Sequence, residues 1–129
     1  MAYNIKQTND SQKIAEQEYA HDDTIKFTKF TSCIGIIVRT SWTLTAVHLV
    51  IVGHEDSPFD KQAVDTVKGI LGDYDEALMI GHIDIWDDNL KETMKYLRDQ
   101  IKKLKEVQLE DGNYGAKVND GGNIEWYSY

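Results

Sequence analysis

The chain has 129 residues, of which 41% are hydrophobic, and its formal net charge at pH 7 is −8. This length suffices for one hydrophobic core but not for two domains, and the negative charge argues against nucleic-acid binding. No apolar stretch is long enough to span a membrane, and residues 1–7 lack the apolar region of a signal peptide. Cys33 is the single cysteine, which allows no internal disulfide and fits a reducing cytosol. We therefore predict a cytoplasmic protein, outside the membrane, with basic or neutral partners.

Residues 1–23 are polar and carry only widely spaced apolar side chains, at Ile5, Ile14 and Tyr19. Such a composition buries little apolar surface. The sequence therefore predicts an N-terminal arm over 1–23, either a lightly packed helix or disordered, followed by a single domain over 24–129.

Residues 33–39 and 43–52 are rich in β-branched side chains and flank a polar break, which predicts a β-hairpin. If the hairpin is symmetric about the bond between residues 40 and 41, Cys33 lies directly opposite His48. Directly opposed residues share a face of the sheet, with Cβ atoms about 4.5–5.5 Å apart. A thiol beside an imidazole can form a thiolate–imidazolium pair, the common form of an activated cysteine.

The alternative for both side chains is ordinary packing, because a free cysteine is among the most buried residue types and a lone histidine is often a core residue. The register of the hairpin decides whether the two side chains can meet at all. A slip of one residue would place Cys33 and His48 on opposite faces of the hairpin.

The remaining segments predict a scaffold of α/β (α+β) class, with a mainly antiparallel central sheet or sandwich covered by helices. Helical apolar spacing occurs over 59–71 and 89–107, and an alternating pattern over 77–86 predicts a third strand. Residues 114–118 and 123–127 flank a glycine-rich turn typical of a hairpin. Both faces of the first hairpin are apolar, so helices or strands should cover both: Ile34, Ile36 and Val38 on one, Ile37, Leu44 and Val50 on the other.

A metal site is the second chemical possibility, because His48, His54, Asp56, His82 and Asp84 all have ligand-type side chains. Their spacing matches none of the strong zinc patterns, and the glycines form no phosphate-binding loop. We therefore predict neither a metal site nor a cofactor.

Two short segments carry a resemblance to a known family: Phe30-Thr31-Ser32-Cys33 and, fifteen residues after the cysteine, Ala46-Val47-His48-Leu49. The arrangement resembles the cysteine-histidine glutamine deamidases, which include the chemotaxis receptor deamidases and the catalytic domains of cytotoxic necrotizing factor-like toxins. The resemblance covers residues 24–85, including an Ile-Gly step at 80–81. Ser32 stands where that family usually has glycine, which readily adopts a left-handed backbone.

The resemblance implies that His48 deprotonates Cys33, that the sulfur attacks the side-chain amide of a protein glutamine, and that ammonia leaves. Backbone N–H groups of Ser32 and Cys33 would stabilise the oxyanion. Thr28 or Thr31 is the candidate third catalytic group, although some family members orient the histidine with a backbone carbonyl. The same pair also suits transglutaminase-like and thioester-hydrolase reactions.

The partner implied is a protein with an exposed glutamine, and the role that of a bacterial regulator or a small effector toxin delivered into a target cell without a signal peptide. The alternative is a non-catalytic acidic binding module, such as an immunity or antitoxin-like protein. Ser32 and the absence of a threonine at the family's usual position favour that alternative.

Overall fold

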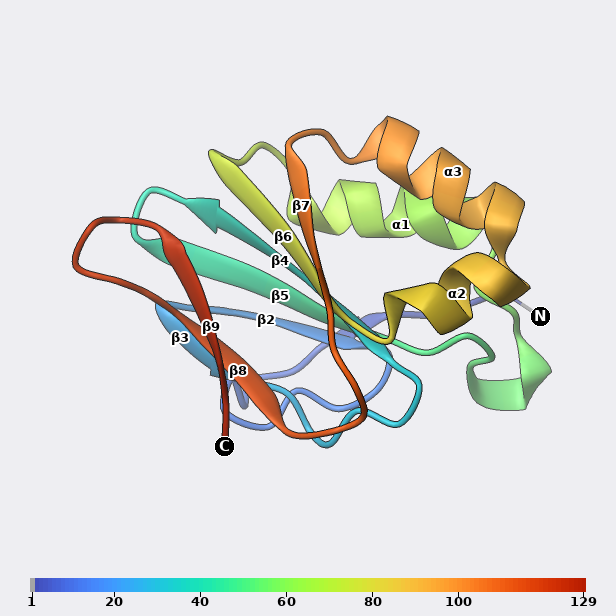
Figure 1. Ribbon diagram of the computed structural model, residues 1–129, viewed down its shortest axis with the longest axis horizontal. Helices are drawn as coiled ribbons and strands as arrows, with labels where there is room; N and C mark the ends of the chain where they lie inside the picture. Colours follow the sequence, from blue (N-terminus) through green and yellow to red (C-terminus); the bar gives the residue numbers. More distant parts are fainter. Residues whose placement is uncertain (1) are drawn as a thin grey trace.

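The computed structural model describes residues 2–129, which fold into two β-sheets and three α-helices (Figure 1). The larger sheet contains, in spatial order, β1 (Lys6–Gln7), β2 (Glu18–Asp22), β5 (Thr43–Leu49), β4 (Ile34–Thr40), β6 (Glu76–Gly81) and β7 (Leu104–Gln108). The smaller sheet contains β3 (Thr24–Lys26), β8 (Tyr114–Val118) and β9 (Ile124–Ser128). The helices are α1 (Lys61–Leu71), α2 (Ile83–Asn89) and α3 (Lys91–Gln100), and a short 3-10 turn, η1, covers His54–Asp56.

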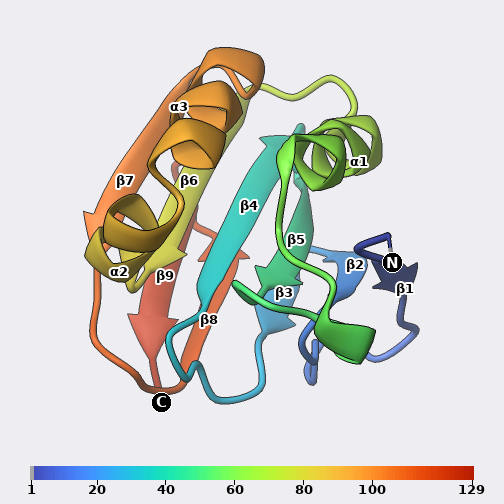
Figure 2. The same cartoon turned by 90° about the vertical axis from the view of Figure 1, so that its right-hand side faces the viewer.

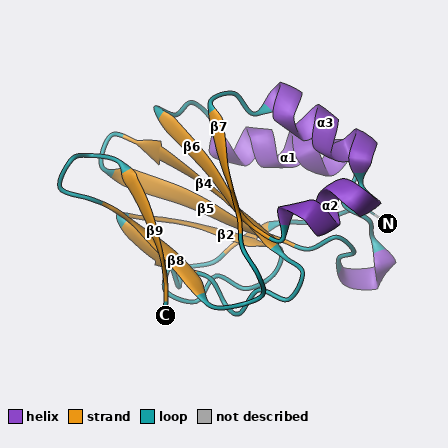
Figure 3. Ribbon diagram, viewed as in Figure 1, coloured by secondary structure: helices purple, strands orange, loops and turns teal. Residues whose placement is uncertain are grey.

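The elements form three layers, with the helices on one face of the six-stranded sheet and the three-stranded sheet on the other (Figures 1 and 2). Strands β2, β5, β4 and β6 pair antiparallel, and only the outer pairs β1–β2 and β6–β7 are parallel. Figure 3 shows the segregation of helix from strand. The predicted fold class, a mainly antiparallel sheet covered by helices, is confirmed.

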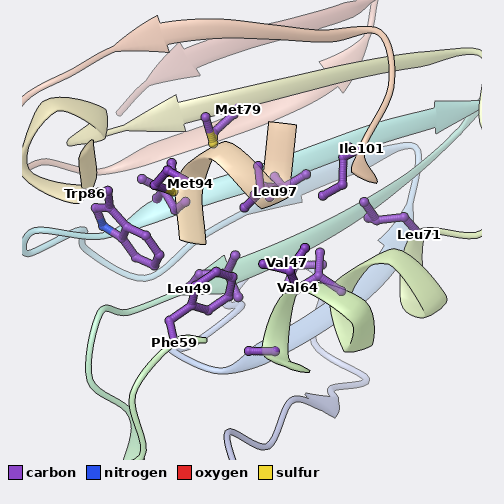
Figure 4. Packing of buried hydrophobic residues seen from close by; sticks show 14 of the residues in the cluster. Val47, Leu49, Phe59, Val64, Leu71, Met79, Trp86, Met94, Leu97 and Ile101 are labelled. Atoms are coloured by element: carbon purple, nitrogen blue, oxygen red, sulfur yellow. The ribbon is translucent and has the colours of Figure 1, made fainter. Parts of the chain in front are cut away.

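Strand β4 supplies both cores because successive side chains of a strand point to opposite faces. Ile34, Ile36 and Val38 pack toward α1 and α3, together with buried side chains from β5, β6 and the helices (Figure 4). Ile37 and Cys33 lie in the second core, between the two sheets, with Phe27 and Phe30. The prediction that both faces of the hairpin are covered is confirmed.

The prediction of an N-terminal arm is wrong for the described part of that segment. Strand β2 pairs along its whole length with β5, and Ile14 is fully buried in the second core. The polar composition misleads because β2 lies near the edge of the sheet, where it buries little more than Ala20 and the loop before it contributes Ile14. This loop supplies part of the candidate site described below.

The predicted helix over 89–107 is correct only in its first part. Helix α3 ends at Gln100, and residues 104–108 form β7, parallel to β6. Lys103 has a φ of 63°, in the left-handed region, and reverses the chain between helix and strand. Leu104 continues the helical spacing of apolar residues, but it is the first residue of β7 and packs against the core from that strand.

The predicted strand over 77–86 ends early, at Gly81, and α2 begins at Ile83. The φ of Gly81 is 124°, and the next N–H, of His82, donates to the Cys33 carbonyl at 3.0 Å. The helix predicted over 59–71 and the C-terminal hairpin are confirmed as α1 and as β8–β9. Asp60 caps the N-terminus of α1, and its carboxylate accepts a hydrogen bond from the Ala63 N–H.

Candidate functional site: a buried cysteine and histidine between the two sheets

The hairpin register differs from the symmetric prediction by two residues. Gly35, not Cys33, lies opposite His48, because the turn is centred one residue later, at 41–42. Ser41 permits this turn with a φ of 57°, and its N–H donates to Asp75 at 2.9 Å. A shift of two keeps a side chain on its original face, so the predicted direct pairing is wrong while the shared face of Cys33 and His48 is correct.

The two side chains meet in the core between the sheets, and both are 0% exposed. Within residues 2–129, Cys33 Sγ, a ring nitrogen of His48 and a carboxylate oxygen of Glu16 all lie within 4.8 Å of one another. Glu16 is an exposed residue of the loop before β2, and its Oε2 lies 3.7 Å from Sγ. The sulfur also lies 3.3 Å from the Thr31 carbonyl oxygen.

A backbone carbonyl fixes the orientation of His48. The Ile14 oxygen lies 2.9 Å from Nδ1. A carbonyl oxygen only accepts hydrogen bonds, so Nδ1 carries the proton and Nε2 carries the lone pair of a neutral ring. Among the described residues, buried Nε2 has no hydrogen-bond partner. The rings of Phe27 and Phe30 pack on the imidazole, with centroids at 5.6 and 4.9 Å.

Of the two predicted threonines, Thr28 is the one that approaches His48. Its hydroxyl lies 3.5 Å from Nδ1, a long contact beside the shorter one to Ile14. Thr31 is exposed and reaches Cys33 only through its backbone carbonyl. The backbone of Ile14 therefore takes the place of a threonine as the orienting group.

Ser32 adopts the left-handed conformation, with a φ of 57°, at the position where the resembling family usually has glycine. Two side chains hold this turn: Trp86 Nε1 donates to the Ser32 carbonyl at 2.9 Å, and Asp111 accepts from the Ser32 N–H at 2.8 Å. The second bond corrects one expectation. Because Asp111 occupies the Ser32 N–H, Cys33 N–H is the oxyanion donor that remains of the predicted pair.

Burial controls the protonation of both groups. It raises the pKa of the Cys33 thiol to about 12, and the nearby Glu16 carboxylate adds to the effect. Burial also lowers the pKa of His48, against the opposing influence of the Ile14 carbonyl and the nearby glutamates. At neutral pH the resting pair is therefore a thiol and a neutral imidazole, instead of the thiolate–imidazolium pair suggested by the sequence.

The other histidine and aspartate residues considered as metal ligands do not gather around His48. His54 and Asp56 lie in η1, and His82 lies before α2 with its Nε2 3.1 Å from Glu110. The sequence reasoning missed Ile14, Glu16 and Asp111. A backbone carbonyl has no sequence signal, and the two acidic residues lie in segments that read as polar loops.

Replacing Trp86 by phenylalanine should loosen the turn that presents Cys33. Trp86 is fully buried, and the change removes the indole N–H that donates to the Ser32 carbonyl. We expect the free energy of unfolding to fall by about 2 kcal/mol, measured by urea denaturation. The matched control is Trp42→Phe, at a side chain 59% exposed, which should change it by less than about 0.5 kcal/mol. Equal effects of the two variants would contradict the role given to Trp86.

No helix within residues 2–129 has the length and apolar character needed to cross a membrane. Comparison with known proteins found no matching protein-family model and no matching curated protein.

Proposed function

We propose that the protein is a cysteine-dependent amidohydrolase that converts a glutamine side chain of a partner protein to glutamate. One observation carries the proposal: the Ile14 carbonyl holds the Nδ1–H of His48, so that the lone pair on Nε2 is unpartnered in the core that also contains Cys33. This is the arrangement that a general base needs. The left-handed Ser32 adds support, because it reproduces at this position the backbone that a glycine allows.

The reaction would start from the neutral pair. His48 Nε2 takes the thiol proton while Cys33 Sγ adds to the amide carbon, and the negative charge on the amide oxygen meets the Cys33 N–H. His48 then returns the proton to the nitrogen, the carbon–nitrogen bond breaks, and ammonia leaves. Water, deprotonated by the same ring, attacks the thioester carbon and the carbon–sulfur bond breaks. His48 returns the proton to Cys33 Sγ, which yields glutamate and restores the neutral pair. Concerted proton transfer suits a buried thiol, because no thiolate has to accumulate before the attack.

Glu16 is one of the groups that cover the sulfur. Cys33 is 0% exposed, whereas Glu16 is exposed and its Oε2 lies 3.7 Å from Sγ. A glutamine brought by a partner would have to displace at least this side chain to reach the thiol. The net charge of −8 favours partners with basic surfaces, in the cytoplasm of the producing cell or of a cell that receives the protein.

The test compares purified wild type with Cys33→Ala, His48→Ala and Thr28→Val. Each is incubated with bacterial and eukaryotic lysates, and mass spectrometry identifies glutamines converted to glutamate while a coupled assay follows ammonia. We expect Cys33→Ala and His48→Ala to abolish both signals, and Thr28→Val to retain most of the activity, because Ile14 orients the ring. Conversion that persists in Cys33→Ala would sink the proposal.

A second function is favoured by a specific observation, the complete burial of Cys33 and His48. In this alternative the pair is core packing, and the protein is a non-catalytic acidic binding module. It predicts a stable complex with a basic protein that is unaffected by Cys33→Ala and weakened by salt. The two functions are separated by the same lysate experiment, since a binding module leaves every glutamine unchanged.

A further inference from the structure

We propose that Glu16, Cys33 and His48 form a binding site for a zinc-class divalent cation, with Glu16 Oε, Cys33 Sγ and His48 Nε2 as ligands. A ring nitrogen of His48, Cys33 Sγ and a carboxylate oxygen of Glu16 lie within 4.8 Å of one another. Because Nδ1 is hydrogen-bonded to the Ile14 carbonyl, Nε2 is the nitrogen that can bind the ion. The independent observation is the buried His48 Nε2, which has a lone pair and no hydrogen-bond partner among residues 2–129. A buried acceptor without a partner is unfavourable, and a metal ion supplies the missing partner.

The ligand types select the kind of ion. A sulfur and an imidazole prefer zinc or similar transition metals over magnesium and calcium, which prefer oxygen ligands. When the ion binds, a Cys33–metal bond replaces the thiol S–H bond, and the proton is released to solvent. The thiolate and the Glu16 carboxylate then balance the two positive charges of the ion, so that the loaded site is neutral.

The geometry needs only a small adjustment. Ligand bonds of about 2.0–2.3 Å in a tetrahedral site place ligand atoms roughly 3.3–3.8 Å apart. Glu16 Oε2 and Cys33 Sγ, 3.7 Å apart, already lie in this range. The ring nitrogen of His48, within 4.8 Å of both groups, has to approach them by up to about 1 Å. Three protein ligands leave the fourth position to water. The site is thus of the open type.

The surroundings match what a histidine ligand requires. The Ile14 carbonyl fixes the tautomer that leaves Nε2 free, as the groups behind a metal-bound histidine commonly do. Phe27 and Phe30 form an apolar wall against the ring. An ion held here occupies both groups of the proposed catalytic pair, so the enzyme would be active only in its metal-free form.

The test uses the untagged 129-residue chain, stripped with a chelator and titrated with Co²⁺ under anaerobic conditions. We expect a near-ultraviolet thiolate-to-cobalt charge-transfer band, visible absorption of tetrahedral intensity, and loss of both on addition of Zn²⁺. Cys33→Ser should remove the charge-transfer band. Glu16→Gln keeps the size of the side chain but removes its charge, and it should weaken binding ~10-fold or more. Glu92→Gln, at an exposed position on α3, is the matched control and should bind as wild type does.

Three results would overturn the site: no charge-transfer band at excess Co²⁺, an unchanged band in Cys33→Ser, or equal affinity of Glu16→Gln and wild type. Because Glu16 is exposed, its variant keeps the test valid even if Cys33→Ser does not fold. The inference does not depend on the amidohydrolase proposal, since the readout is spectroscopic. A protein that binds Co²⁺ but releases no ammonia retains the metal site and loses only the enzymatic function.

Discussion

The Gly81→Ala substitution is expected to lower the free energy of unfolding by about 3 kcal/mol or more, although it adds a single methyl group. Gly81 has a φ of 124°, which other residues adopt only with strain. A Cβ atom there would lie 2.4 Å from the Cys33 carbonyl oxygen and 2.9 Å from the Ile34 Cα. Both are backbone atoms, one directly before strand β4 and one in its first residue, so they cannot rotate away as a side chain would. Urea denaturation gives the free energy.

Gly69→Ala is the matched control, because it makes the same chemical change in the exposed part of helix α1. A Cβ at Gly69 meets no atom within 4 Å. Alanine is the better helix former, so this variant should be more stable than wild type by about 0.5–1 kcal/mol. If Gly81→Ala were as stable as wild type, the close approach of β6 to Cys33 would be contradicted. If Gly81→Ala is destabilised as expected, Gly81 is required for the backbone geometry of the candidate site.

The sequence correctly predicts the secondary structure of segments in which the spacing of apolar residues matches the face that they bury. The first hairpin, α1 and the C-terminal hairpin are of this kind, since each buries an apolar face or is bounded by clear turn residues. It fails where pairing decides the structure. Strand β2 is polar and is stabilised by its partner β5, and β7 follows a helix with no change in apolar spacing. Such strands depend on long-range pairing, which local patterns do not contain.

The candidate site was predictable to the same extent. The fifteen-residue spacing identified Cys33 and His48, and their shared face survives because the register error is an even number. The contributions of Ile14 and Glu16 come from a loop brought in by β2, so no pattern around the cysteine reveals them. The same loop also affects the protonation state of Cys33. It helps to bury the pair and places Glu16 beside the sulfur, which raises the pKa of Cys33, so the side chain is a thiol and not the expected thiolate.

Cys33 should be nearly inert toward iodoacetamide in the folded, chelator-treated protein at pH 8. The thiolate is the reacting species, and burial raises the pKa of this thiol to about 12, compared with about 8.5 for a free cysteine. We expect alkylation of the folded protein to be roughly 1,000-fold slower than that of the same protein unfolded in urea. Glu16→Gln should accelerate it, because this change removes the negative charge beside the sulfur.

The same shift has a consequence for stability. The unfolded chain ionises Cys33 near pH 8.5 and the folded protein only near pH 12, so the stabilisation is complete below about pH 8.5 and is lost as the pH rises toward 12. The free energy of unfolding should fall by as much as about 1.4 kcal/mol per pH unit within this range. Several tyrosines, among them Tyr3 and Tyr114, also have raised pKa values in the folded protein, so they add to the slope as they ionise in the unfolded chain near pH 10. Cys33→Ser should therefore reduce the slope between about pH 8.5 and 9.5 without abolishing it.

Alkylation of His48→Ala separates the two descriptions of the pair. If the resting state is a thiol beside a neutral imidazole, loss of the ring removes no activating charge and opens a path to the sulfur, so the rate should rise or stay constant. A thiolate–imidazolium pair predicts fast alkylation of wild type with an apparent pKa well below 8.5, which returns toward that value in His48→Ala. Fast alkylation of that kind would mean that the core around Cys33 opens in solution, because a buried thiolate beside the Glu16 carboxylate is not stable.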